Sequence, residues 1–115
     1  MDVLHSHIGS IHFVQLRGRL DASQVAALSE KLLPLADEAG HQIVLSLAEL
    51  DSITSLGLRL MLMLAHRSQH HGGALVVCEL HGFVLEVFET SGFIEILPIE
   101  TSRAAAIQRV SKAAD

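Results

Sequence analysis

The stretch "DSITSLGLRLMLML", Asp51 to Leu64, decides how the rest of the chain is interpreted. Three hydroxyl side chains, those of Ser52, Thr54 and Ser55, come first, and Arg59 is the only charge in the apolar run that follows. Serine is favoured at a helix N-cap because its oxygen accepts a backbone N–H bond. The stretch therefore predicts a helix that begins at about Ser55, with the hydroxyl of Ser55 as its cap.

A cap accounts for one hydroxyl but not for the apolar residues behind it, which point in nearly every direction around the helix. One face of a sheet cannot cover them all, so we expect those near the helix start to meet a partner, with Leu58 on the exposed side. Gly57 lies in the first turn, where a missing side chain permits close backbone approach by another molecule. The hydroxyl cluster is therefore interpreted as a docking point. The apolar residues concerned are Leu56, Leu58, Leu60, Met61, Leu62, Met63 and Leu64.

Towards the N-terminus, the pattern indicates an opening hairpin and a first helix. Residues 11–18, "IHFVQLRG", are typical of a strand, and the ten residues before them form a weaker one that closes on a Gly-Ser turn. Asp21 occupies the N-cap position of a helix that ends before Gly40, and Pro34 is expected to kink or shorten that helix. The nearly continuous apolar run 42–47 predicts a central strand covered on both faces.

Towards the C-terminus, the second helix is expected to end at His70, before a pair of glycines. Strands and helices continue to alternate, in the order ββαβαβαβα, which predicts an α/β fold with a mixed, largely parallel sheet and about four helices. A length of 115 residues suits one domain, over 1–115. The remaining elements are a strand over 74–78, a short helix over 81–92, a short last strand over 93–99 and a closing helix over 101–114.

Composition excludes several classes of function. The net charge is −5, and no basic tract is present, so direct nucleic-acid binding is not expected. No signal peptide is recognised at the start, and no apolar run reaches the ~18 residues that span a bilayer, so no membrane contact is expected. The single cysteine, Cys78, cannot form an internal disulfide and suits a reducing compartment. These features predict a cytoplasmic protein.

Four motifs recur in the order and spacing of a known family. "LRGRLD" at 16–21 matches L-x-G-x-L-D before the first helix, and "TSLGLR" at 54–59 matches the motif that opens the second helix. "GGALVV" at 72–77 and "FETSG" at 88–92, followed by "FIEIL", match the later motifs. On these residues the sequence resembles the bacterial anti-sigma factor antagonists built on the STAS domain, and the resemblance covers essentially the whole chain.

The resemblance implies a partner switch. Unphosphorylated members of the family bind an anti-sigma factor that is also a serine kinase and so free its target, phosphorylation breaks the complex, and a metal-dependent serine phosphatase restores it. By position in the motif the phosphoacceptor falls on Ser55. Thr54 replaces the usual Asp and is a possible second acceptor. The family's partner-facing surface corresponds to Asp21, Ser23, Thr54, Leu56, Gly57, Leu58 and Arg59. Stand-alone STAS domains also resemble accessory subunits of lipid-transport ATPases, and that alternative stays open.

Neither catalysis nor a bound metal is expected. The sequence has no G-x-S-x-G elbow around Ser55 and no phosphate-binding glycine loop, so the kinase chemistry must come from a partner and no cofactor is implied. His5 and His7 can share one face of a strand with His12 across the hairpin, which invites a metal site. No cysteine or carboxylate cluster completes a zinc set, however. Cys78 is interpreted as a buried small apolar residue.

Overall fold

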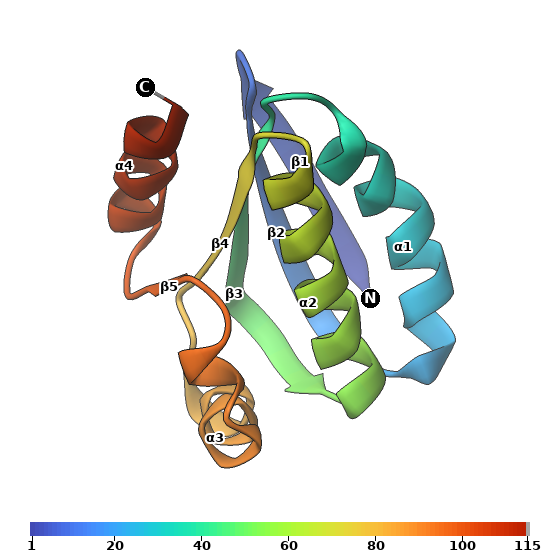
Figure 1. Cartoon of the computed structure of the whole chain (residues 1–115). Coiled ribbons are helices and arrows are strands. Elements are labelled where there is room, and N and C mark those ends of the chain that lie inside the picture. Colours follow the sequence, from blue (N-terminus) through green and yellow to red (C-terminus); the bar gives the residue numbers. More distant parts are fainter. Residues whose placement is uncertain (115) are drawn as a thin grey trace.

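The computed structural model describes the backbone of residues 1–114 and the side chains of residues 1–112. Within these residues a five-stranded sheet is flanked by four α-helices (Figure 1), which confirms the predicted α/β class and the order ββαβαβαβα. The elements are β1 (Asp2–Ile8), β2 (Ile11–Leu20), α1 (Ala22–Asp37), β3 (Gln42–Ile53), α2 (Ser55–His70), β4 (Ala74–Cys78), α3 (Gly82–Ser91), a 3₁₀ turn η1 (Phe93–Glu95), β5 (Ile99–Glu100) and α4 (Arg103–Ala114).

The sheet is mixed, with the strands in the order β1-β2-β3-β4-β5. β1 and β2 form the predicted antiparallel hairpin, and every other neighbouring pair is parallel. Parallel neighbours require a crossover connection. Helix α1 connects β2 to β3, α2 connects β3 to β4, and α3 with η1 connects β4 to β5.

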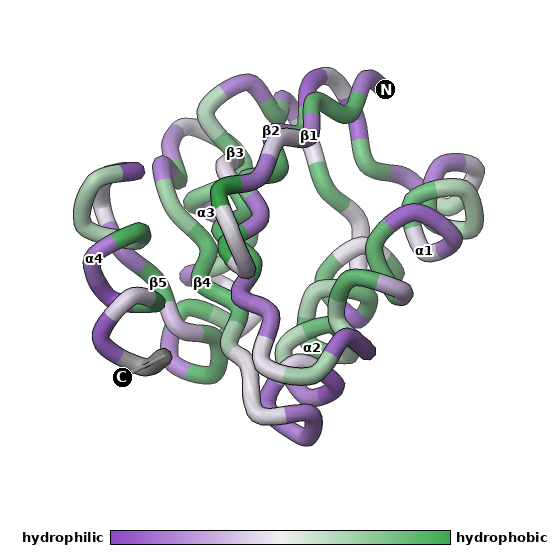
Figure 2. The backbone as a smooth tube through the Cα atoms, turned by 90° about the horizontal axis from the view of Figure 1, so that it is seen from above, coloured by the Kyte–Doolittle hydropathy of each residue, from purple (hydrophilic) through white to green (hydrophobic). Residues whose placement is uncertain are grey.

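Strand β3 is the centre of the core, as predicted, because apolar side chains cover both of its faces. Ile43 and Leu45 belong to the main cluster, which includes the buried residues of α1 and α2. Val44 points the other way and packs with Ala106 and Val110 of α4. Figure 2 shows this layering, with α4 on one side of the strands and the pair α1 and α2 on the other.

Three details differ from the prediction. β3 extends to Ile53, beyond the apolar run that identified it. The predicted last strand begins as a 3₁₀ turn, because Gly92 adopts the left-handed φ of 80° and turns the chain away from the sheet, so that β5 spans only Ile99–Glu100. Helix α1 is not shortened at Pro34 but continues for one more turn to Asp37. No helix in the described residues is both long and apolar enough to cross a membrane.

Candidate functional site

The ends of β2 and β3 bring the first two helices together. Parallel pairing aligns Leu20 with Ile53, so Asp21 and Thr54, the residues that follow, lie at the same edge of the sheet. The Thr54 N–H donates to the Leu20 carbonyl oxygen at 3.1 Å, which fixes the two chain segments against each other. Helices α1 and α2 therefore begin side by side at the carboxyl ends of the strands, the edge at which parallel sheets usually bind ligands.

Thr54, and not Ser55, is the N-cap residue of α2. Thr54 is extended (φ −102°, ψ 172°), its side chain makes no capping hydrogen bond, and its carbonyl oxygen accepts the first helical bond from Leu58 N–H at 3.0 Å. Ser55 is the first helical residue, it is exposed, and its hydroxyl bonds to no residue within 1–112. The prediction that Ser55 caps the helix is wrong, because β3 continues to Ile53 and leaves only Thr54 between strand and helix.

The start of α2 can accept a negative charge. The N–H groups of Ser55, Leu56 and Gly57 precede the first helical hydrogen bond, and none of them bonds to another residue that the structure describes. Unsatisfied N–H groups and the helix dipole together make a helix N-terminus favourable for anions. The exposed hydroxyl of Ser55 thus lies next to free backbone donors.

Gly57 is required by the core and not by a partner. It is buried, and a Cβ added to it would lie 2.9 Å from both Leu20 Cγ and Ile53 Cγ1. Real Cβ atoms essentially never approach other atoms below 3.0 Å. The chain's own strand ends therefore make the close approach that the sequence suggested at Gly57, and this packing explains the glycine without an outside molecule.

Leu58 is a core residue, contrary to the prediction that it lies on the exposed side of the helix. It is 3% exposed and packs in the main cluster, because helical spacing places it on the face that also carries Met61 and Leu64. The exposed apolar side chains of α2 are instead Leu56 and Met63, each 42% exposed. Met63 was not singled out from the sequence, although its seven-residue separation from Leu56 places the two on one side.

These exposed residues form one surface, called here the α2 face: Ser55, Leu56, Arg59 and Met63. Arg59 lies one helical turn after Ser55, is exposed, and forms no ion pair with any residue the structure describes. Arg59 follows Ser55 by four positions, so the two side chains are neighbours on the helix surface. The α2 face therefore combines a hydroxyl, a cation and two apolar side chains.

Asp21 is the N-cap of α1, as predicted. Its Oδ1 accepts the Ser23 N–H at 3.0 Å and the Ser23 hydroxyl at 2.6 Å. The bond from the Ser23 hydroxyl is the main reason that the pKa of Asp21 lies below its usual range. Both side chains thus act in the turn that begins α1, and Asp21 follows Leu20, the residue to which Thr54 is hydrogen-bonded.

We expect Asp21→Asn and Asp21→Ala to differ in thermal stability. Asn caps a helix about as well as Asp, so Asp21→Asn should melt close to wild type, whereas Asp21→Ala should melt a few degrees lower. Thermal unfolding followed by circular dichroism at pH 7 measures both. If Asp21→Asn also binds a partner more weakly than wild type, the carboxylate belongs to the docking surface as well. Equal affinity would limit Asp21 to the cap.

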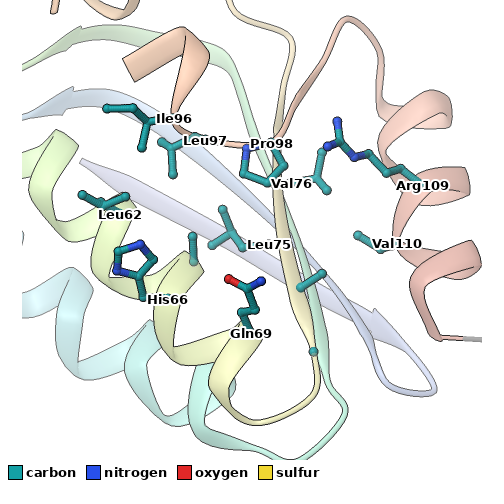
Figure 3. A pocket seen from close by; sticks show the side chains of 13 residues that line it. Leu62, His66, Gln69, Leu75, Val76, Ile96, Leu97, Pro98, Arg109 and Val110 are labelled. Atoms are coloured by element: carbon teal, nitrogen blue, oxygen red, sulfur yellow. The ribbon is translucent and has the colours of Figure 1, made fainter. Parts of the chain in front are cut away.

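Two other features lie away from this edge. A cavity of about 490 Å³ opens between α2 and α4 beside β4 (Figure 3). Its α2 residues include Leu62, His66 and Gln69, which follow Ser55 and Arg59 at helical spacing, so the cavity lies further along the same side of α2. Burial, with Glu79 nearby, raises the pKa of the Cys78 thiol to about 12. The thiol is therefore neutral at pH 7 and unsuited to nucleophilic chemistry.

Comparison with known proteins identifies the family of this chain. Residues 9–98 match the family model described as "Mlab, STAS domain". The chain belongs to the STAS domain family. A relative from Bordetella bronchiseptica, provisionally named the anti-sigma factor antagonist BtrV, is 41% identical over 91 residues, which are 79% of this chain and 78% of that protein.

Solved structures show the same STAS fold. An anti-sigma factor antagonist from Mycobacterium paratuberculosis superposes with a TM-score of 0.84 at 15% identity and covers 96% of this chain and 93% of its own. The antagonist SpoIIAA in its unphosphorylated form gives 0.80 at 19% identity, over 96% and 97% of the two chains. Its phosphorylated form, from Bacillus, gives 0.72 at 19% identity, over 95% and 99%.

Proposed function

We propose that this STAS domain is an anti-sigma factor antagonist that phosphorylation of Ser55 switches off. In the unphosphorylated state the α2 face, with Asp21, Ser23 and Thr54 beside it, binds an anti-sigma factor that is a serine kinase, and so frees the kinase's target. The observation that carries the proposal is the exposed, unbonded hydroxyl of Ser55 at the first position of α2. The name of the Bordetella relative supports the antagonist role.

The fold should tolerate a phosphate on Ser55. The phosphate would meet the free N–H groups at the start of α2 and the positive end of the helix dipole. Arg59, one turn further along, is the nearest cation on the α2 face and can pair with phosphate oxygens. The hydroxyl is not used by the fold, so its modification breaks no internal hydrogen bond of the described residues.

The same phosphate should disrupt a complex formed through the α2 face. It adds about 1.5 to 2 negative charges beside Leu56, a side chain that a partner would cover. Burying a charged group without full compensation costs several kcal/mol. A loss of about 2.7 kcal/mol weakens binding a hundredfold, so one phosphate is sufficient to act as the switch.

The proposal assigns the phosphoryl transfer to partners. A serine kinase adds the phosphate, a metal-dependent serine phosphatase removes it, and the STAS domain acts as their substrate in the cytoplasm without a catalytic site or cofactor of its own. The buried, neutral thiol of Cys78 agrees with this assignment. The net charge of −5 argues against a direct contact with DNA.

Phosphorylation by the cognate anti-sigma kinase tests the proposal. Incubated with the kinase and ATP, wild type should gain one phosphate, Thr54→Val should gain the same phosphate, and Ser55→Ala should gain none. Mass spectrometry of the intact protein and its peptides reports the number and the site. Modification of Ser55→Ala but not of Thr54→Val would move the acceptor to Thr54. No modification of wild type would refute the kinase relationship.

The alternative is an accessory subunit of a lipid-transport ATPase, in which the α2 face would bind the ATPase. Affinity purification from the native cell separates the two functions, because the proposal requires a serine kinase among the retained proteins and the alternative requires a transport ATPase. Leu56→Asp provides the control. Whichever partner binds the α2 face should be lost from this variant and retained by wild type.

A further inference from the structure

Four histidines meet at the end of the sheet opposite to the α2 face. His5 and His7 come from β1, His12 from the start of β2, and His41 from the loop between α1 and β3. Pairing of β1 with β2 sets His7 opposite His12. The His12 Nδ1 lies 2.8 Å from His5 Nε2, and the His12 Nε2 lies 2.7 Å from His41 Nδ1. His5, His12 and His41 are called here the histidine row.

The row joins three segments that are distant in the sequence. His12, at its centre, is only 6% exposed, and both of its nitrogens are engaged. The ring centroids of His41, His5 and His7 lie 4.9, 5.0 and 5.5 Å from that of His12. As the side chains stand, no three His, Cys, Asp or Glu residues in the described part of the chain can hold a metal ion. Hydrogen bonds between the rings therefore hold the histidine row together.

Hydrogen bonds between imidazoles depend on the number of protons. Each N–H···N bond needs one donor and one acceptor, and neutral rings satisfy both bonds of the row when all N–H groups point in one direction. One added proton makes His12 a donor on both sides, but it places a positive charge on a ring that is only 6% exposed. A further proton, on His5 or His41, places a second imidazolium charge about 5 Å from the ring of His12. Lowering the pH therefore destabilises the histidine row.

Burial of His12, followed by the positive charges that His41, His5 and His7 acquire, lowers the pKa of His12 below its ordinary value of 6.5. Glu38, after the end of α1, is the facing carboxylate and acts in the opposite direction. A base whose pKa is lowered by folding binds its proton more readily in the unfolded chain. The histidine row thus contributes its full stabilisation of the folded domain above about pH 6.5. This contribution to the free energy of unfolding decreases as the pH falls below that value.

We propose that the histidine row is an acid-sensitive clasp that holds the edge strand β1 and the loop before β3 onto β2. β1 is an edge strand of the sheet and, among the described residues, pairs with β2 alone. Protonation of the row weakens the attachment of β1 and exposes the edge of β2, which makes the hairpin the acid-sensitive part of the domain. His12 lies near the start of β2, at the opposite end of the strand from Leu20, which leads to the α2 face.

Hydrogen exchange tests the clasp. Amide protection is compared at pH 7.5 and pH 5.5 in a buffer containing a chelator, corrected for intrinsic exchange, with β4 amides as the internal reference. Uptake of one proton on opening changes the opening equilibrium about tenfold per pH unit below 6.5. β1 amides should therefore lose protection relative to β4 at pH 5.5, by up to about tenfold. Equal loss in both strands, or no loss, would overturn the proposal.

A matched variant separates protonation from hydrogen bonding. In the double variant His5→Gln with His41→Asn, an amide replaces each ring at the bonding nitrogen and cannot take up a proton in this range. The double variant should protect β1 as wild type does at pH 7.5 and lose less protection at pH 5.5. His12→Phe keeps the ring volume but removes both bonds, so its β1 should be weakly protected at both values. A double variant with the full wild-type pH dependence would overturn the proposal, whether or not His12→Phe folds.

Discussion

Leu58→Asp is expected to unfold the domain. Leu58 is 3% exposed and contacts the main core cluster. Truncation of a buried leucine costs about 2–5 kcal/mol, and an unpaired carboxylate in the same place adds several kcal/mol more. The total approaches or exceeds the 5–15 kcal/mol by which folded domains are typically stable. Circular dichroism and urea unfolding should show little or no native protein.

Leu56→Asp is the matched control for that result. Leu56 lies two positions earlier on the same helix and is 42% exposed, so the same substitution should change the free energy of unfolding by no more than about 0.5 kcal/mol. This variant should fold and lose the partner. A folded Leu58→Asp protein would show that α2 packs on the sheet through a different face, and an unfolded Leu56→Asp protein would show the same.

The contrast between these residues shows what the sequence of α2 could predict. The bounds Ser55–His70 were predicted correctly, because the hydroxyl cluster and the following glycines mark both ends locally. The face that meets the sheet was not predicted, since apolar residues surround the helix and their spacing favours no single side. Gly57 was misinterpreted for a related reason: Leu20, which approaches it, is distant in the sequence.

The candidate site shows the same division between local and long-range information. Asp21 caps α1 by accepting a hydrogen bond from the backbone of Ser23, only two positions away. The local residue types were therefore enough to predict this cap. Whether Ser55 or Thr54 caps α2 depends on where β3 ends, which strand pairing with β2 decides. His41 joins His5 and His12 only through the fold, so the sequence showed three of the clustered histidines and not the fourth.

Substitutions at Ser55 are expected to change binding in opposite directions while the fold stays intact. Ser55 provides no cap and is exposed, so Ser55→Ala should alter stability by no more than about 0.5 kcal/mol. Ser55→Asp places a negative charge at the first helical position, where the dipole stabilises it by about 0.3–1 kcal/mol. Urea unfolding should therefore find Ser55→Ala as stable as wild type, and Ser55→Asp at least as stable. A larger loss in either would show that the hydroxyl has a structural role.

Binding to the anti-sigma kinase should separate the two variants clearly. Ser55→Ala should bind as tightly as unmodified wild type and stay bound when ATP is added, because no phosphate can form. Ser55→Asp adds one charge, less than the ~1.5 to 2 of a phosphate, and should weaken binding by about tenfold, against about a hundredfold for phosphorylated wild type. Ser55→Asn, which is polar but neutral, is the control for side-chain size. If Ser55→Asn weakens binding as much as Ser55→Asp, the size of the side chain and not its charge breaks the complex.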